Sequence, residues 1–336
     1  MKDILNKLIE HKSLDKELSR QILLELAQGK YNNSQVAAFL TVYMMRSITV
    51  DELEGFRDAM LELCLSVPID EYDAIDLCGT GGDGKDTFNI STLASFVVAG
   101  AGQNVAKHGN NGVSSVCGSS NLLAHFGYEF TNDIGELKRS LDQANICFLH
   151  APLFHPAMKN VAPIRQELGV KTFFNMLGPM VNPSFPKKQL VGVFSLELAR
   201  LYGYLYQKTD KDFIILHTLD GYDEVSLTGR FKMISNQGEQ VLGPEDLGLQ
   251  TVKRQEISGG KTVEESAKTF DQILKGQGTS AQNAVVIANA GMALYSANRE
   301  AGLDYCINKA EESLLSGRAL KAFQRLISRK KIYTIA

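Results

Sequence analysis

One glycine-rich stretch decides how the chain folds: Asp76-Leu77-Cys78-Gly79-Thr80-Gly81-Gly82-Asp83-Gly84. The apolar residues before it predict the end of a strand, and the apolar segment 93–98 after it predicts a helix. Clustered glycines are costly unless the backbone turns tightly or touches a ligand. A strand, a glycine loop and a helix start direct N–H groups at one point, which favours an anion site. The spacing matches neither a P-loop nor a dinucleotide motif, and a glycine turn without a ligand is the alternative.

Length and composition indicate an ordinary globular protein. The 336 residues, 44% hydrophobic and 22% charged, predict one large domain or two of unequal size. The net charge of -3 does not favour bulk nucleic-acid binding. No apolar run approaches the roughly 20 residues of a membrane helix, and the first residues lack the apolar core of a signal peptide. The five cysteines form no C-x-x-C pair and indicate reduced thiols in a cytoplasmic protein.

Residues 1–66 have a helical pattern. Ser13 and Asn33 are predicted to begin helices, and Thr49-x-x-Glu52 is a capping box ahead of a third. The middle helix, near residues 36–44, is apolar around much of its circumference. Such a helix lies in a core or is shared with another chain. Burial in the core is the first interpretation, and a dimer face is the second.

Strands and helices alternate from about residue 70, which predicts an α/β domain with a mostly parallel sheet. The predicted strands lie at 74–78, 104–107, 146–149, 190–194 and 213–216. Residues 151–186 interrupt the alternation with prolines and short helical pieces, so we expect them to return to the helical part. A hairpin is predicted around 236–238, and helices are predicted at 280–297 and 308–328.

A second loop of the same kind follows the next strand. It runs Lys107-His108-Gly109-Asn110-Asn111-Gly112 and continues to Gly118-Ser119-Ser120. Two such loops at one edge of a parallel sheet would face one crevice, where α/β proteins bind ligands. Lys107 can offer a point charge to a phosphate, although a strand-end lysine on the solvated surface is the alternative.

An acidic pair, Asp223 and Glu224, follows the predicted strand 213–216. Two carboxylates together with phosphates suit Mg²⁺, which takes few protein oxygens. Neighbours on a regular strand point to opposite faces, so the pair must lie on a bend to share one ion, or else serve two ions. A polar loop without a metal is the alternative.

His155, Met158 and Arg165 form a further candidate group. On a helix, positions 155 and 158 would share a face, with 165 close to it. Arginine can bind a carboxylate through two hydrogen bonds. The sequence contains no evident Ser-His-Asp order and no His/Cys spacing typical of zinc.

Together these segments resemble the anthranilate phosphoribosyltransferase family. The resemblance covers nearly the whole chain and continues through residues 155–159, 163–165, 172–179, 182–183 and 221–224. It implies a glycosyltransferase of tryptophan biosynthesis that joins anthranilate to 5-phosphoribosyl 1-diphosphate and releases pyrophosphate. It also implies the nucleoside-phosphorylase-like phosphoribosyltransferase fold. In that fold a small all-helical domain (1–68 and 156–186, with the dimer face) accompanies a large α/β domain (69–155 and 187–336) with a mostly parallel central sheet and the phosphoribosyl diphosphate site.

The resemblance also implies residue roles. The phosphoribosyl diphosphate would be bound by Gly79, Gly82, Asp83, Thr87, Asn89, Ile90, Ser91, Thr92, Lys107, His108, Gly109, Asn110, Ser114, Ser115 and Ser119. Anthranilate would be bound by Gly79, His108, Asn110, Pro152, His155, Met158, Arg165 and Gly178. Two Mg²⁺ per subunit would be held by Ser91, Asp223 and Glu224. No general base is implied, and Lys107, Asp223 and Glu224 would act electrostatically. A cytoplasmic homodimer that binds neither nucleic acid nor membrane is expected.

Three positions depart from the family pattern. Asn111 replaces the arginine of K-H-G-N-R, Asn121 the aspartate of G-S-A-D, and Lys171 the arginine of G-x-R-T. We expect these changes to tune substrate affinity and to leave the reaction unchanged. Two rival functions remain open: a pyrimidine nucleoside phosphorylase of the same architecture, and a non-catalytic relative that binds nucleic acid. The acidic pair argues against the first rival, and the charge balance argues against the second.

Overall fold

The computed structural model describes residues 1–112 and 116–328, and the chain divides into two compact units. The smaller unit comprises Met1–Ser66 and Ala151–Phe185, and the larger comprises Val67–His150 and Pro186–Ala336. The second segment of the smaller unit begins directly after a strand, at 151, where the sequence predicted 156. One reason is that the Leu65 N–H donates to the Phe154 carbonyl at 2.8 Å, which ties this turn to the helical unit.

Helices make up the smaller unit. Its elements are α1 (Lys2–Ile9), α2 (Lys16–Ala27), α3 (Asn33–Met45), α4 (Val50–Glu62), α8 (Ala151–Phe154), η2 (Pro156–Asn160), α9 (Ala162–Leu168), α10 (Phe174–Leu177) and η3 (Gly178–Met180). The two chain segments share one aromatic core. Phe173 stacks on Phe56 with ring centroids 4.5 Å apart, and Phe39 meets both edge-on.

The predicted capping box of α4 is confirmed, with Thr49 and Glu52 bonded reciprocally. Glu52 is fully buried, accepts the Leu14 N–H at 2.9 Å and pairs with Arg46. The predicted start of α2 at Ser13 is wrong, because Asp15 is the residue whose carboxylate accepts the Leu18 N–H. A negative side chain at this position satisfies an end N–H and also favours the helix dipole.

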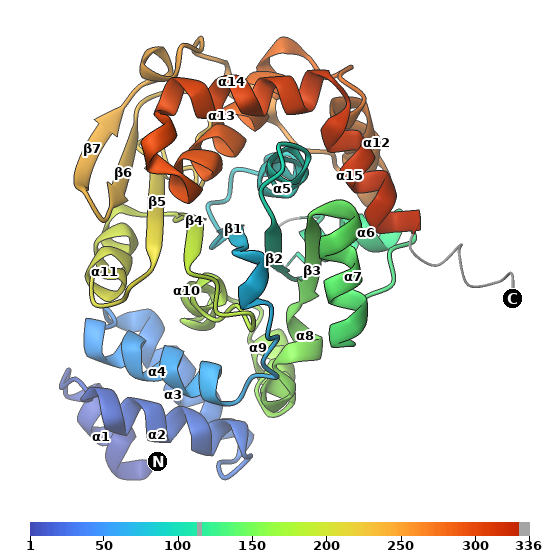
Figure 1. Cartoon of the computed structure of the whole chain (residues 1–336). Helices are drawn as coiled ribbons and strands as arrows, with labels where there is room; N and C mark the ends of the chain where they lie inside the picture. Colours follow the sequence, from blue (N-terminus) through green and yellow to red (C-terminus); the bar gives the residue numbers. More distant parts are fainter. Residues whose placement is uncertain (113–115, 329–336) are drawn as a thin grey trace, which may run out of the picture. The chain divides into compact units, whose positions relative to one another are not determined.

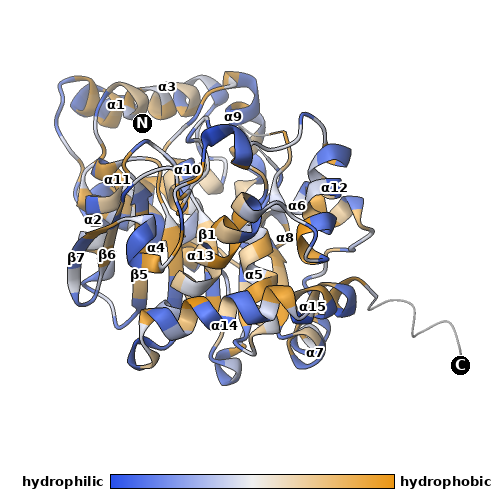
Figure 2. Ribbon diagram, turned by 90° about the horizontal axis from the view of Figure 1, so that it is seen from above, coloured by the Kyte–Doolittle hydropathy of each residue, from blue (hydrophilic) through white to orange (hydrophobic). Residues whose placement is uncertain are grey.

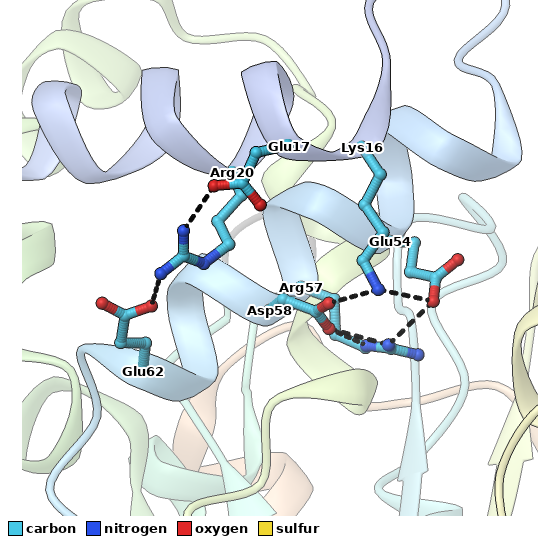
Figure 3. A network of polar contacts seen from close by, with 7 residues as sticks. All are labelled: Lys16, Glu17, Arg20, Glu54, Arg57, Asp58 and Glu62. Atoms are coloured by element: carbon cyan, nitrogen blue, oxygen red, sulfur yellow. Dashed lines mark hydrogen bonds and ion pairs between the residues drawn. The ribbon is translucent and has the colours of Figure 1, made fainter.

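Helices α2 and α4 approach closely. A Cβ on Gly55 would lie 2.2 Å from the Lys16 carbonyl oxygen, so no side chain fits there. Ion pairs flank this contact and join Lys16, Glu17, Arg20, Glu54, Arg57, Asp58 and Glu62 (Figure 3). Because water screens partly exposed pairs of this kind, each contributes little to the stability of the α2–α4 contact.

The larger unit contains a mostly parallel sheet, as predicted. Its strands are β1 (Ile75–Gly79), β2 (Val105–Gly109), β3 (Ile146–His150), β4 (Lys188–Gly192), β5 (Asp212–Thr218), β6 (Phe231–Ser235) and β7 (Gly238–Leu242). In the described residues they lie in the order β3-β2-β1-β4-β5-β6-β7, which Figure 1 shows from right to left. Strands β1 to β5 are parallel, and β6 and β7 form the predicted antiparallel hairpin. The strand order reverses between β1 and β4, where a ligand crevice is expected.

Helices complete the larger unit. They are η1 (Asp70–Tyr72), α5 (Ile90–Gly100), α6 (Ser119–His125), α7 (Ile134–Ala144), α11 (Leu196–Tyr206), η4 (Pro244–Leu247), η5 (Arg254–Ile257), α12 (Val263–Leu274), α13 (Ser280–Ala297), η6 (Arg299–Ala301), α14 (Leu303–Leu315) and α15 (Arg318–Ile327). Helix α5 is hydrophobic over most of its length (Figure 2) and packs against α13. The single helix predicted at 308–328 is wrong, because Gly317 at φ 76° separates α14 from α15. Among the described residues, no helix has the length and apolar character needed to cross a membrane.

Candidate active site

The carboxyl ends of β1 and β4 meet at two glycines. Gly79 and Gly192 are register partners, and the acidic segment crosses directly over them. A Cβ on Gly79 would lie 2.7 Å from Asp223 Oδ2, and a Cβ on Gly192 would lie 1.4 Å from the Asp223 carbonyl oxygen. Gly192 therefore excludes any side chain, whereas a side chain at position 79 would displace the Asp223 carboxylate. The sequence indicated Gly79, whereas Gly192 was missed because an isolated strand-end glycine carries no motif.

The backbone of the acidic pair is held from both sides. Thr218 Oγ1 donates to the Glu224 carbonyl. Asn289 accepts the Val225 N–H at 3.0 Å and donates to the Val225 carbonyl at 2.9 Å. These bonds position the carboxylates without touching them. Sequence reasoning missed both residues, although Asn289 was detectable as the one amide within the apolar stretch 284–294 of helix α13.

The N–H groups that the sequence predicts for anion binding face the acidic pair in this structure. The Gly81 N–H donates to Asp223 Oδ2 at 2.7 Å, and the Ser91 N–H donates to Glu224 Oε1 at 3.1 Å. Ser91 lies in the first turn of α5, where the helix dipole favours negative charge. The glycine loop, the helix start and the carboxylates therefore converge on one point.

Both acidic groups hold protons more tightly than usual. Burial, followed by the charge of Asp83, raises the pKa of Asp223 to about 7, against the opposing Gly81 N–H. Burial, followed by the charges of Asp223 and Asp83, raises the pKa of Glu224 well above its ordinary value. Groups coupled this closely titrate as a pair. Without a cation, the pair therefore retains a proton near neutral pH.

The pair therefore predicts a pH-dependent response to divalent cations. Because the folded-state pKa values exceed the unfolded values of about 4, the pair stabilises the fold fully below about pH 4 and loses that contribution as pH rises through the folded-state values. A cation needs ionised carboxylates and displaces protons. We expect Mg²⁺ with pyrophosphate to raise the Tm more at pH 8 than at pH 6, measured by differential scanning fluorimetry. Equal shifts at the two pH values would contradict the assignment.

The donor set fits Mg²⁺ only with help from a ligand. The pair contributes to the wall of a small cavity. That wall is mostly apolar, and its residues are Leu77, Cys78, Ser91, Ala94, Leu190, Gly192, Leu216, Asp223, Glu224 and Asn289. Across residues 1–112 and 116–328, no three His, Cys, Asp or Glu side chains are arranged to hold a metal. Mg²⁺ commonly binds through one or two carboxylates plus phosphate oxygens and water. The pair can take part in such a site when a phosphorylated ligand supplies the remaining oxygens.

Lys107 lies beneath this site and away from the solvated surface. Its side chain is buried, and Nζ donates to the Leu77 carbonyl at 2.7 Å and to Ser91 Oγ at 3.5 Å. Burial lowers the pKa of Lys107, while the negative charges of Asp76 and Glu224 oppose that shift. The alternative of a solvated surface lysine is therefore excluded.

The second glycine loop folds tightly onto the start of α6. A Cβ on Gly118 would lie 2.2 Å from the Gly112 nitrogen. Asn121 Oδ1 accepts the Gly112 N–H at 2.8 Å and the Gly118 N–H at 3.1 Å. The departure at Asn121 therefore keeps an acceptor where the family has a carboxylate. Ser119 Oγ donates to the Asn110 carbonyl at 3.4 Å.

Other predicted residues of the larger unit surround these loops. Asn89 Nδ2 donates to the Cys117 carbonyl at 2.8 Å, and Thr87 forms an isolated bridge with Ser258. Asp83 accepts the Lys85 N–H within its own loop at 3.1 Å. The side chains of Ile90 and Thr92 are buried. Ser114 and Ser115 lie outside the described residues.

Five predicted anthranilate residues lie in the smaller unit: Pro152, His155, Met158, Arg165 and Gly178. The expectation of one shared helix face is wrong. Helix α8 ends at Phe154, and Arg165 lies in the separate helix α9. Prolines cause this division, because Pro156 and Pro163 each occupy the first turn of a new helical piece. His155 is buried, with Nε2 3.0 Å from the Val181 carbonyl.

Arg165 is half-buried beside an aromatic ring and an amide. Its guanidinium lies 4.9 Å from the ring centroid of Phe174, and Nη2 donates to Asn175 Oδ1 at 3.4 Å. Burial lowers the pKa of Arg165. No carboxylate of the described residues pairs with it. Arg165 therefore retains the capacity to bind a carboxylate from a ligand.

Comparison with known proteins gives one consistent result. Residues 2–64 match the model of the glycosyl transferase family helical bundle domain, and residues 71–320 match that of the glycosyl transferase family a/b domain. An anthranilate phosphoribosyltransferase from Christiangramia forsetii is 61% identical, over 97% of this chain and 98% of its own length. One from Bacteroides thetaiotaomicron is 51% identical, over 97% and 98%.

Solved structures agree with the sequence relatives. The anthranilate phosphoribosyltransferase of Thermus thermophilus superposes with a TM-score of 0.89 at 32% identity, covering 97% of this chain and 98% of that one. The Saccharomyces cerevisiae enzyme in complex with PRPP and Mg superposes with a TM-score of 0.87 at 26% identity, covering 97% and 96%. The yeast enzyme with 4-fluoroanthranilate gives a TM-score of 0.84 at 25% identity over the same shares.

Proposed function

We infer, because the chain belongs to the anthranilate phosphoribosyltransferase family, that it transfers the phosphoribosyl group of 5-phosphoribosyl 1-diphosphate to the amine of anthranilate. The products are N-(5-phosphoribosyl)anthranilate and pyrophosphate, and the reaction belongs to tryptophan biosynthesis. The observation that carries this inference for the site itself is the convergence of Asp223, Glu224, the Gly81 N–H and the Ser91 N–H at the strand switch point. That arrangement suits a diphosphate with Mg²⁺.

We propose electrostatic catalysis without a general base. The aryl amine of anthranilate is neutral near pH 7, so it can attack before it loses a proton. The difficult step is departure of pyrophosphate from the ribose C1, which builds negative charge on the leaving group. Backbone N–H groups of the glycine loop and of the α5 start stabilise that charge, and the Lys107 ammonium adds positive charge close to the α5 start. Mg²⁺, when bound, supplies further charge neutralisation.

We propose the residue roles that the family resemblance implies. For phosphoribosyl diphosphate they are Gly79, Gly82, Asp83, Thr87, Asn89, Ile90, Ser91, Thr92, Lys107, His108, Gly109, Asn110, Ser114, Ser115 and Ser119. For anthranilate they are Gly79, His108, Asn110, Pro152, His155, Met158, Arg165 and Gly178. Ser91, Asp223 and Glu224 are proposed to serve two Mg²⁺. The yeast relative in complex with PRPP and Mg supports the presence of the metal.

Arg165 is proposed to bind the anthranilate carboxylate. We expect Arg165→Ala to raise the KM for anthranilate about tenfold or more, because a charged hydrogen bond contributes about 1.5–3 kcal/mol. The KM for phosphoribosyl diphosphate should stay within about twofold. Steady-state kinetics with each substrate varied in turn measure the two values. Arg230→Ala, at an exposed position of the larger unit, serves as the control. A rise confined to phosphoribosyl diphosphate would contradict the assignment.

A fluorescence assay tests the proposed function directly. Anthranilate consumption should require both phosphoribosyl diphosphate and Mg²⁺ and should stop when a chelator is added. Metal-independent release of a base from thymidine by phosphate would instead support the phosphorylase rival. Salt-sensitive retention of DNA in a gel shift, without anthranilate consumption, would support the nucleic-acid rival.

We propose a cytoplasmic homodimer formed through the helical unit. Large apolar side chains are exposed on two helices that contact each other: Ile9 of α1 at 63%, and Met44 and Met45 of α3 at 43% and 80%. The five cysteines are free thiols, which suits a reducing compartment. Met45→Glu should convert the dimer to a monomer in light scattering, because burying that charge in an apolar face is costly. An unchanged mass would place the interface elsewhere.

A further inference from the structure

Asp76 is a buried carboxylate for which the proposed mechanism has no role. It lies in β1, between β2 and β4, and its side chain is fully excluded from solvent. Oδ1 accepts the His108 N–H at 3.2 Å. Oδ2 accepts Gln189 Nε2 at 3.1 Å and the Cys78 thiol at 3.6 Å. Each of these partners is a donor, so the hydrogen bonds favour the ionised form of the Asp76 carboxyl group. A buried charge persists only where it is paired and hydrogen-bonded.

The bond to His108 replaces part of the sheet. Strands β1 and β2 pair at Ile75 and Val105. A parallel ladder continuing from that pair would direct the His108 N–H to the Leu77 carbonyl. The His108 N–H donates to Asp76 instead, and the Leu77 carbonyl accepts Lys107 Nζ at 2.7 Å. Two side-chain bonds therefore stand where one backbone bond would otherwise join β1 to β2.

The orientation of Gln189 is also fixed. Its Oε1 accepts the Tyr206 hydroxyl at 2.7 Å, so its Nε2 must face Asp76. Gln189 is the register partner of Asp76 across β1 and β4. The carboxylate therefore joins three adjacent strands, β2, β1 and β4, and reaches β2 at His108, next to the second glycine loop.

We propose that Asp76 is a positioning residue of the phosphoribosyl diphosphate site, which holds the His108 backbone and the Lys107 ammonium in place by substituting for the β1–β2 ladder. This inference rests on the proposed function. Asp76 acts through the second glycine loop and contacts no reacting atom. Its negative charge also lies beside the buried Lys107, whose charge it helps to maintain.

Asp76→Asn tests the proposal, because the amide keeps the shape but places an NH₂ group against a donor. We expect the KM for phosphoribosyl diphosphate to rise about tenfold or more, while the KM for anthranilate stays within about twofold. The double variant Asp76→Asn with Gln189→Glu restores a carboxylate to the network, and that carboxylate can accept from the new amide at position 76 and from the Tyr206 hydroxyl. It should recover the KM to within about threefold of the original.

Tyr206→Phe is the matched control, since it removes a buried bond from the far end of the same network. It should lower the Tm and leave both KM values unchanged. The proposal is overturned if folded Asp76→Asn keeps its KM, if the double variant shows no recovery, or if Tyr206→Phe raises the KM equally.

If Asp76→Asn does not fold, Gln189→Met is the second test, because it removes one donor to the carboxylate. It should raise the KM for phosphoribosyl diphosphate about threefold, and an unchanged KM would also overturn the proposal. Calorimetry of phosphoribosyl diphosphate with the unaltered protein separates the two ideas, since absence of binding there refutes the proposed function itself.

Discussion

Replacing Gly192 with alanine should reduce kcat/KM by about 100-fold or more, because displacements of about 1 Å at a reacting centre cost that much. The added Cβ would lie 1.4 Å from the Asp223 carbonyl oxygen and 2.5 Å from its carbon. The obstacle is backbone, so no rotamer change can relieve it. The acidic segment must move away from β4, and both carboxylates move with it. Overpacking of this kind also costs about 1–3 kcal/mol of stability.

The control for this variant lies in the loop that carries the acidic pair. A Cβ on Gly229 would meet nothing within 4 Å, so Gly229→Ala should retain full activity. Circular dichroism and thermal melting show whether each variant is folded at the assay temperature. A folded Gly192→Ala protein with kcat/KM within about twofold of the original would show that the position of the pair does not limit catalysis.

The sequence was sufficient for the architecture and for the two loops. Alternating apolar strands and helices predicted a mostly parallel sheet, and the hairpin at Gly238 was detectable from turn residues alone. Helix boundaries were less predictable. Ser13 and Asp15 are both good capping residues. The path of the chain into α2 decides which of the two side chains reaches a free N–H group at the helix N-terminus.

The parts of the site that the sequence did not predict are contacts between residues that lie far apart in the chain. Gly192 and Asn289 belong to no motif, and their roles arise because the acidic segment returns to touch β4 and α13. The peptide dipoles were predicted to face a ligand, yet the Gly81 and Ser91 N–H groups bind Asp223 and Glu224 in this structure. Contacts between residues more than 100 positions apart cannot be obtained from local spacing.

The same contacts suggest how the site changes when a ligand binds. A cation that ionises both carboxylates competes with the Gly81 and Ser91 N–H groups for the carboxylate oxygens. The two N–H groups that it releases can then donate to diphosphate oxygens. Ligand oxygens and metal would therefore bind together more tightly than either alone. This coupling gives a physical reason for pairing an acidic segment with an anion-binding loop.

Replacing both acidic residues, Asp223→Asn with Glu224→Gln, should lower kcat by about 100-fold or more, the scale on which loss of a charge-stabilising group acts. The amide oxygens can still accept the Gly81 and Ser91 N–H groups, so the backbone should keep its course. The Tm without Mg²⁺ should stay equal or rise, because two poorly solvated acids are replaced by neutral groups. The Tm increase on adding Mg²⁺ with pyrophosphate should disappear.

Asp220→Asn is the matched control for that double variant. Asp220 lies in the same loop, but its Oδ2 binds Thr228 Oγ1 at 2.8 Å and pairs with Arg254, away from the pair. It should lose little activity and keep the full response to Mg²⁺. Turnover of the double variant equal to that of Asp220→Asn would reject the metal assignment, because the two proteins differ in whether charge remains at the strand switch point. Loss of turnover with an intact Mg²⁺ response would instead place the metal elsewhere and leave the carboxylates with a role in turnover that does not depend on Mg²⁺.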